Sequence, residues 1–228
     1  MKQYPETIEN RWDVLYRDYP EIYNTFASFS YQPSILQVVR ERFDVVGKTV
    51  LDIGAGGGQS ALPLSRYAAQ VIGVEPEAAM RAVAEQSARD NGVENVSFFA
   101  GSAEAIPLPD GAVDMVMAIT APLAVEEALR VVRRPGVLLQ VGIAPHWYGG
   151  ELDHIIGDPA PGLEAATCDL TERHGFSMID FDSVQDYGTQ NNILRTYGFI
   201  FGRRAIAHLK RTGQTTIRWR FRIHYRWV

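Results

Sequence analysis

Hydrophobic and polar positions follow three different patterns along this chain. Residues 5–45 have the pattern of helices, broken near Pro20 and Pro33. From Lys48 onward, short β-branched runs alternate with helical stretches of roughly 10–15 residues, which is typical of βαβ units and a parallel, doubly wound α/β sheet. Strands are predicted over residues 48–53, 70–76, 95–101, 112–120 and 135–143. Helices are predicted over residues 60–68, 77–92 and 125–134.

The last third of the chain has its own pattern. A helix is predicted over 163–175, a sixth strand over 177–187 and a mainly helical stretch over 190–213. The tail then alternates strictly, which predicts a strand. One face carries Ile217, Trp219, Phe221, Ile223, Tyr225 and Trp227. The other carries Arg218, Arg220, Arg222, His224 and Arg226.

The arginine face of that tail needs an explanation, because unpaired buried charges are costly. Three uses are open: exposure to solvent at a frayed end, pairing with acids, or burial in a homodimer interface. Contact with an anionic substrate or with RNA is a fourth.

Composition narrows the class of protein. The chain has 228 residues, 46% of them hydrophobic, which suits one α/β domain over residues 1–228. Its net charge of -5 disfavours a nucleic-acid binder. No signal-peptide pattern or apolar run of about 20 residues is present, so we expect a cytoplasmic protein without a membrane partner. The single cysteine, Cys168, excludes an internal disulfide and a multi-cysteine zinc site.

The turn after the first predicted strand, LDIGAGGG, is rich in glycine. A dinucleotide fingerprint G-x-G-x-x-G counted from Gly54 and Gly56 requires a third glycine where Gln59 stands. A phosphate loop also fails, because no Lys-Ser/Thr pair follows. Asp52, at the strand end, would repel a pyrophosphate and suits a cation such as an amino group. Glycines let a ligand approach the backbone closely.

Two later strand ends complement this turn. Glu75 ends the second strand at about the distance expected of a ribose-binding acid, where a carboxylate can accept from both hydroxyls. The third strand ends in the small-residue turn 101–104, where a flat base could rest. The three strand ends together suggest a nucleoside that carries a positive group.

The segments LDIGAGGG, VIGVEP, GSAEAIPLPDGAVDMV and ALRVVRRPGVLL, in this order, resemble the class I S-adenosylmethionine-dependent methyltransferases. The likeness covers about residues 49–143 and is greatest to the broad subgroup that methylates small molecules and quinones. It implies a Rossmann-like, mostly parallel seven-stranded sheet with an antiparallel last strand. It also implies a helical lid at 1–45, a cofactor-binding core at 48–143, and a substrate-side part at 144–228 with a helical insert at 191–211.

The resemblance assigns roles to particular residues. S-adenosylmethionine, and S-adenosylhomocysteine as product, would contact Asp52, Gly54, Ala55, Gly56, Gly58, Glu75, Pro76, Met80, Ser102, Ala103, Glu104 and Ile119. Asp52 and the glycine turn would hold the methionine portion, and Glu75 the ribose. The adenine would lie by Ser102, which stands where the family usually has Asp. The turn 119–122 would flank the transferred methyl group.

Candidate residues on the substrate side are less specific. His146 follows the fifth strand and is the candidate catalytic base, the alternative being a loop histidine bonded to backbone. Phe29, Tyr31, Trp147 and Tyr197 are the predicted substrate-pocket residues. Phe29 and Tyr31 belong to the aromatic residues before the first strand, which also include Tyr19, Tyr23 and Phe26. Plain helix packing explains these aromatic residues equally well, and the insert bearing Tyr197 could simply cover the sheet.

A metal site is not predicted, because Glu151, Asp153 and His154 match no standard ligand spacing.

The predicted function is methyl transfer to oxygen, nitrogen or carbon of a small-molecule acceptor by in-line displacement. Residues 119–122 read Ile-Thr-Ala-Pro rather than Asn/Asp-Pro-Pro-Tyr, which argues against methylation of a base amine in nucleic acid. Three alternatives stay open: a catalytically inactive protein that binds the cofactor, an NAD(P)-dependent oxidoreductase, and a tight turn without a ligand.

Overall fold

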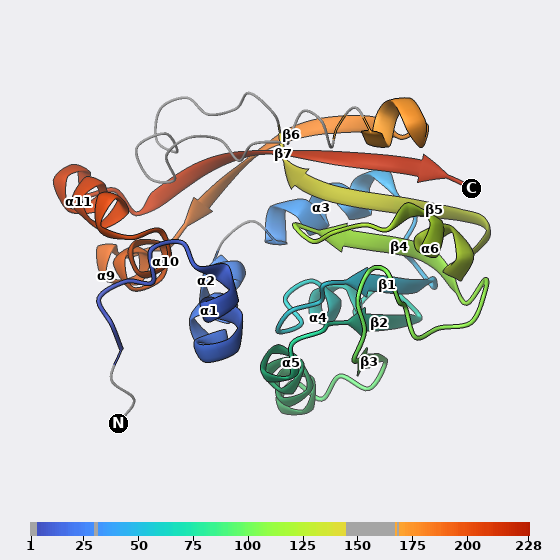
Figure 1. Cartoon of the computed structure of the whole chain (residues 1–228), viewed down its shortest axis with the longest axis horizontal. Coiled ribbons are helices and arrows are strands. Elements are labelled where there is room, and N and C mark those ends of the chain that lie inside the picture. The colour runs from blue at the N-terminus through green and yellow to red at the C-terminus, as the bar shows by residue number, and fades with distance from the viewer. Residues whose placement is uncertain (1–3, 30–31, 145–166, 168) are drawn as a thin grey trace.

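A seven-stranded sheet forms the centre of the described part of the molecule. The computed structural model describes residues 4–29, 32–144, 167 and 169–228. The sheet has the order β3-β2-β1-β4-β5-β7-β6 (Figure 1). Strands β1 to β5 are parallel, and β7 runs antiparallel to both β5 and β6. The predicted fold class is therefore confirmed. The strands are β1 Thr49–Ile53, β2 Gln70–Val74, β3 Val96–Phe99, β4 Val113–Ile119, β5 Val132–Ile143, β6 Ser177–Asp186 and β7 Thr216–Trp227.

Helices cover both faces of the sheet, and the alternation of side chains along each strand determines which residues they meet. Val50, Met115 and Leu139 point into a core shared with the helices before β1. Leu51 and Leu138 point into a second core on the opposite face. The covering helices are α3 Gln32–Arg42, α4 Ala61–Leu64, α5 Ala78–Asp90 and α6 Val125–Val131. Helix α4 is shorter than the predicted 60–68, because hydrogen-bonded turns replace the helix after Leu64.

The helices before β1 are α1 Trp12–Asp18, α2 Pro20–Phe29 and α3. Pro20 begins α2, where its missing N–H costs nothing. The helical segment before β1 is therefore interrupted where predicted: α2 begins at Pro20, and Pro33 is the second residue of α3.

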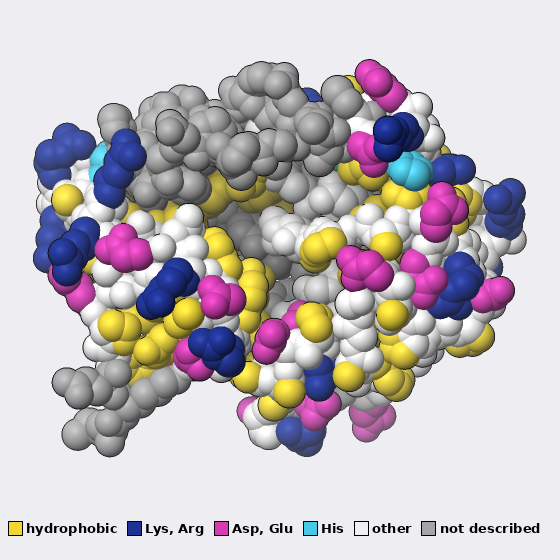
Figure 2. Space-filling model, in the orientation of Figure 1, with side chains coloured by type: hydrophobic (Ala, Val, Ile, Leu, Met, Phe, Trp, Pro, Cys, Tyr) yellow, Lys and Arg dark blue, Asp and Glu magenta, His cyan; other side chains and the backbone are white. Residues whose placement is uncertain are grey.

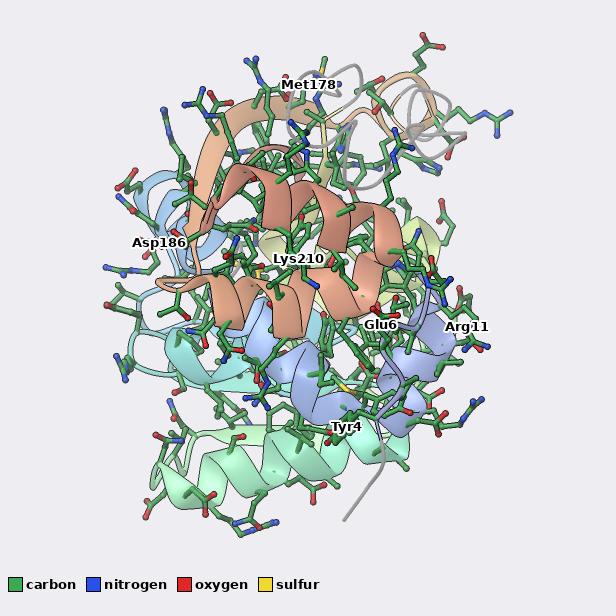
Figure 3. All side chains as sticks on the ribbon, turned by 90° about the vertical axis from the view of Figure 1, so that its left-hand side faces the viewer. Tyr4, Glu6, Arg11, Met178, Asp186 and Lys210 are labelled. Carbon is green, nitrogen blue, oxygen red and sulfur yellow. The ribbon has the colours of Figure 1, made fainter. Side chains whose placement is uncertain are left out.

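The segment between β6 and β7 is helical and consists of α9 Gln190–Ile193, the π-helical turn η2 Leu194–Gly198, α10 Phe199–Phe201 and α11 Arg203–Thr212. It packs against the N-terminal segment rather than standing alone. Ile8 N–H donates to the Phe199 carbonyl at 2.9 Å, and the rings of Trp12 and Phe201 lie 5.7 Å apart. Figure 3 shows Tyr4, Glu6 and Arg11 along this segment beside the insert helices.

Part of the arginine row on β7 is paired with acids on β6, one of the predicted alternatives. The Arg222 guanidinium donates to both carboxylate oxygens of Asp180, at 2.6 and 2.8 Å. Arg220 lies 3.7 Å from Asp182. The antiparallel register places each arginine opposite its acid. His224 is buried, which lowers its pKa to about 4, so the ring is neutral at neutral pH.

Within the range 163–175, where a helix was predicted, the described residues include a π-helical turn, η1, over Asp169–Arg173. Among the described residues, no helix combines the length and apolar character that crossing a membrane requires. No group of three or more metal-ligating side chains occurs in this part of the chain either.

Candidate functional site

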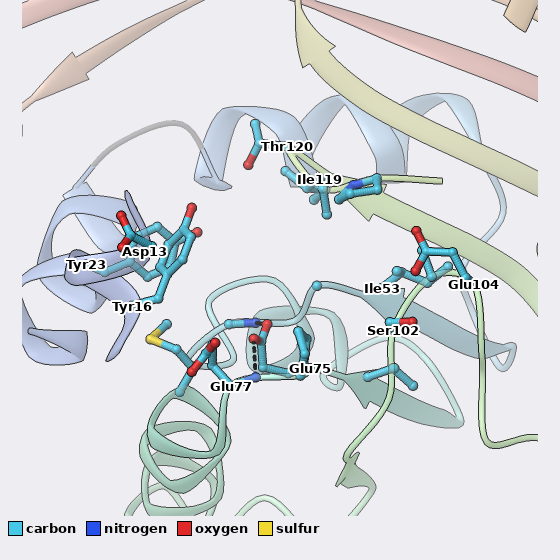
Figure 4. Close-up of a pocket in the computed structure, with 18 residues that line it drawn as sticks. Asp13, Tyr16, Tyr23, Ile53, Glu75, Glu77, Ser102, Glu104, Ile119 and Thr120 are labelled. Carbon is cyan, nitrogen blue, oxygen red and sulfur yellow. Dashed lines mark hydrogen bonds between the residues drawn. The ribbon is translucent and has the colours of Figure 1, made fainter. Parts of the chain in front are cut away.

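A cavity of about 520 Å³ opens at the carboxyl ends of β1, β2 and β4 (Figure 4), where open α/β sheets bind ligands. The face drawn in Figure 2 is visibly hollowed near its centre. The volume falls in the range of small-molecule sites, about 300–1,000 Å³. Its walls come from the turns after these strands, the start of α5, and helices α1 and α2.

The glycine turn forms the floor of this cavity through Gly54 and Gly56. Both have positive φ, +69° and +54°, which favours glycine. A Cβ on Gly54 would lie 2.5 Å from Cβ of Ala121, in the turn after β4. The two turns therefore approach so closely that only glycine fits at position 54.

Glu75, the predicted ribose-binding acid, directly follows β2 and lies in the cavity wall. Its Oε2 accepts from Gly56 N–H and its Oε1 from Glu77 N–H, both at 2.9 Å. Burial raises the pKa of Glu75, while these two backbone donors act in the opposite direction. A carboxylate has about four acceptor sites, so two remain for ligand hydroxyls. Pro76 and Met80 line the same wall.

Asp52, Ala55 and Gly58, which were predicted to contact the cofactor, are not among the residues that line the cavity. A Cβ on Gly58 would meet Leu62, Phe98 and Ala84 at 3.3–3.4 Å, so this end of the turn packs against its own scaffold. Asp52 is almost completely buried. Its Oδ2 has no hydrogen-bond partner in the described part of the chain. Burial, with a smaller contribution from the Glu75 charge, raises the pKa of Asp52 to about 8.

This carboxyl group should make stability depend on pH. Its ordinary pKa of 3.8 applies in the unfolded chain, so folding takes up a proton between about pH 4 and 8. The free energy of unfolding then falls as pH rises through this window. We expect Asp52→Asn to stabilise the protein by at least about 1 kcal/mol more at pH 8 than at pH 5, since one pKa unit corresponds to about 1.4 kcal/mol.

Urea unfolding at the two pH values measures this difference. Asp44→Asn, at an exposed carboxylate, is the matched control and should give no pH-dependent change. An equal effect of Asp52→Asn at both pH values would contradict the assignment.

The adenine side of the predicted site also lies in the cavity. Ser102, Ala103 and Glu104 line it. A hydrogen bond from the Ser102 side chain lowers the pKa of Glu104. Ser102 is therefore engaged with Glu104 in this structure.

The turn after β4, predicted to flank the methyl group, forms the opposite wall with Ile119, Thr120, Ala121 and Pro122. Thr120 has a φ of +51°, uncommon for a β-branched residue. Such outliers cluster at functional sites, where the surrounding structure holds them. Sequence reasoning had no signal for this strain.

Helices α1 and α2 contribute cavity residues that the sequence analysis did not select. Asp13 and Tyr16 come from α1, and Glu77 precedes α5. Tyr23 of α2, one of the aromatic residues before the first strand, also lines the cavity. Asp13 and Tyr16 are three residues apart and so share a helix face. This spacing was the sequence signal that could have grouped them.

Other substrate-side predictions have different outcomes. Tyr197 is fully buried and does not line the cavity. Its ring centroid lies 4.5 Å from that of Phe201 and 5.5 Å from that of Phe26. The insert packs this ring against α2 and the sheet, and its place in a substrate pocket stays a prediction. Tyr31, His146 and Trp147, like Glu151, Asp153 and His154, lie outside the described residues, as does the side chain of Phe29.

Gln59, the residue that breaks the dinucleotide fingerprint, joins the glycine turn to α2. Its Oε1 accepts from Gly57 N–H at 3.1 Å, and its Nε2 donates to Asn24 Oδ1 at 2.6 Å. One side chain therefore fixes the turn and the helix that covers it relative to each other.

Gln59→Ala should weaken ligand binding in the cavity by roughly fivefold, because each lost hydrogen bond contributes about 1 kcal/mol. Amides of α2 should also exchange faster with deuterium. Gln59→Glu is the matched control: it keeps the acceptor, and the Asn24 amide can turn to donate, so near-normal behaviour is expected. Equal behaviour of both variants would contradict the role of this contact.

The fold and the cavity define a doubly wound protein with a site of small-molecule size at the carboxyl ends of its strands. Residues 50–136 match the family described as "Methyltransferase domain". The uncharacterized methyltransferase YcgJ of Bacillus subtilis is 41% identical over 99 residues, 40% of this chain and 39% of that relative. By sheet order and by this match, residues 50–136 are similar to the class I S-adenosylmethionine-dependent methyltransferases.

Solved structures share the fold over most of the chain. The structure of YcgJ has a TM-score of 0.57 at 22% identity and covers 87% of this chain and 95% of that one. The [4+2]-cyclase SpnF has a TM-score of 0.57 at 21% identity and covers 84% of this chain and 79% of that one. The sequence match thus spans less than half of its curated relative, and the structural matches concern the fold alone.

Proposed function

We propose that this protein transfers a methyl group from S-adenosylmethionine to an oxygen, nitrogen or carbon atom of a small-molecule acceptor. The observation that carries the proposal is the pairing of Glu75, in the cavity wall, with the bare backbone of Gly54 and Gly56 in its floor. A carboxylate with two acceptor sites left fits a ribose diol. A turn without Cβ atoms fits the close approach of an amino-acid tail.

The charges of the cavity support this cofactor over a phosphorylated one. Within the described residues, its charged lining consists of the carboxylates of Asp13, Glu75, Glu77 and Glu104. Such a surface attracts a sulfonium and repels a pyrophosphate. An NAD(P)-dependent oxidoreductase is therefore disfavoured.

The chain's own residues would act mainly by alignment. When bound, the cofactor supplies an activated methyl group on a good leaving group. Glu75 would hold the ribose, Met80 and Ala103 would exclude water, and the strained turn at Thr120 would border the reacting face. Holding two reactants at near-attack distance can contribute about 7–11 kcal/mol to barrier lowering.

Calorimetry with S-adenosylhomocysteine and with NADH tests the cofactor, and a screen of small acceptors with labelled S-adenosylmethionine tests turnover. We expect binding of S-adenosylhomocysteine only, and label transfer to a small acceptor. Binding without transfer would favour the alternative of a cofactor-binding protein without activity. Exclusive binding of NADH would overturn the proposal.

A further inference from the structure

The carboxylates of the cavity are not equivalent. Glu75 accepts from two backbone N–H groups, and Glu104 accepts from Ser102. Asp13 lies away from both, on α1 at the other end of the cavity (Figure 4). Its charge therefore faces a different part of the ligand from the strand ends that would hold the nucleoside.

Two tyrosine rings stand beside Asp13. Tyr16 is one helical turn further along α1, and Tyr23 comes from α2. Their ring centroids are 5.0 Å apart with an interplanar angle of 87°, so edge meets face. Figure 4 shows the three side chains grouped on one side of the cavity. We call this group the Asp13 corner.

The Asp13 corner lies directly beside the glycine turn. A Cβ on Gly56 would meet Cε1 of Tyr23 at 3.2 Å, so this ring covers the backbone of the turn. A ligand seated on the turn therefore has one end next to the corner. The described lining residues of the cavity include no lysine, arginine or histidine. The cation nearest to Asp13 along α1 is Arg17, which interacts with Asp13 electrostatically but lies outside the lining and donates both of its hydrogen bonds to Asp18.

A carboxylate flanked by aromatic rings is suited to a substituted ammonium group. The carboxylate supplies the opposite charge, and tyrosine faces attract cations within about 6 Å of their centroids. An anionic group would instead meet an acidic surface without a compensating cation.

We infer that the Asp13 corner is an ammonium-binding subsite. This inference extends the proposed function, since the ammonium could belong either to the amino-acid tail of the cofactor or to an amine acceptor. In both cases the corner selects for positive charge at this end of the cavity and against phosphate groups.

The test uses Asp13→Asn and Tyr16→Leu in the full chain, with Glu85→Gln as the control. Glu85 lies on α5, pairs with Arg89 and does not line the cavity. Three probes are titrated by calorimetry: S-adenosylhomocysteine, 5′-methylthioadenosine, which lacks the amino-acid tail, and benzyltrimethylammonium. The last is added to the free protein and to the S-adenosylhomocysteine complex.

If the cofactor supplies the ammonium, Asp13→Asn weakens S-adenosylhomocysteine roughly tenfold and leaves 5′-methylthioadenosine unchanged. If the acceptor supplies it, both nucleosides bind normally and benzyltrimethylammonium binding falls roughly tenfold. In either case Tyr16→Leu weakens the same probe, and Glu85→Gln leaves all three unchanged.

Two results would overturn the inference. The first is unchanged binding of every probe in both variants. The second is that wild type does not bind benzyltrimethylammonium while Asp13→Asn binds S-adenosylhomocysteine normally. Failure of the proposed function looks different: wild type itself would then not bind S-adenosylhomocysteine. The ammonium probe on the free protein still decides the role of the corner in that case.

Discussion

Replacing Glu75 with alanine is expected to weaken S-adenosylhomocysteine binding by roughly 10²-fold or more. The reason is the loss of two charge-assisted hydrogen bonds to the ribose, each contributing about 1.5–3 kcal/mol. The substitution also removes the acceptor for the N–H groups of Gly56 and Glu77. Calorimetry measures the affinity, and thermal unfolding shows that the variant is folded.

Two further variants make this result specific. Glu75→Gln keeps one carbonyl acceptor and should lie between wild type and alanine. Glu85→Ala removes an exposed acid on α5 that pairs with Arg89 and does not line the cavity, so its affinity should stay within twofold of wild type. An alanine variant at position 75 that binds within threefold of wild type would show that Glu75 does not hold the ribose.

Gly54→Ala should have the second large effect, lowering both stability and ligand affinity. The left-handed backbone costs a non-glycine residue about 1–2 kcal/mol, and the added Cβ would sit 2.5 Å from Ala121. Relief of this clash must separate the turn after β1 from the turn after β4, which form the floor and wall of the cavity. We expect a loss of at least roughly tenfold in S-adenosylhomocysteine affinity, since a displacement costing about 1.4 kcal/mol is tenfold.

The chain offers matched controls for this substitution. Gly47 has nearly the same φ, +68°, but among the described residues no atom lies within 4 Å of the position that a Cβ would take. Gly47→Ala should therefore lower stability by about 1–2 kcal/mol and leave affinity unchanged. The double variant Gly54→Ala/Ala121→Gly removes the clash and should recover part of the affinity. Equal affinities for the two single glycine variants would contradict the account.

The strands and the glycine turn could be predicted because their signals are local. β-branched runs, glycines with positive φ and an acid at a strand end are readable within a few residues, and Gly54, Gly56 and Glu75 meet in the cavity as expected. Asp52 shows the limit of such reading. Its sequence position beside the turn does not reveal that the side chain is almost completely buried and does not line the cavity.

Residues that reach the site through packing could not be placed from the sequence. Asp13 and Tyr16 line the cavity only because α1 packs against α2 and α5. Tyr197 has the aromatic character of a pocket residue, yet the sequence does not show whether such a ring packs against a cavity or against other helices and the sheet. The acids that pair with the β7 arginines were readable in principle, since Asp180 and Asp182 alternate on β6. Whether these acids pair with the arginines depends on the register between β6 and β7, whose paired residues lie about 40 positions apart in the sequence.

The most direct test of the central claim is a crystal structure of the protein with S-adenosylhomocysteine. The ribose hydroxyls should lie within hydrogen-bonding distance of the Glu75 carboxylate, about 2.6–3.2 Å, with the amino-acid tail over Gly54 and Gly56. A nucleoside bound elsewhere, or a Glu75 side chain turned away from the sugar, would contradict it.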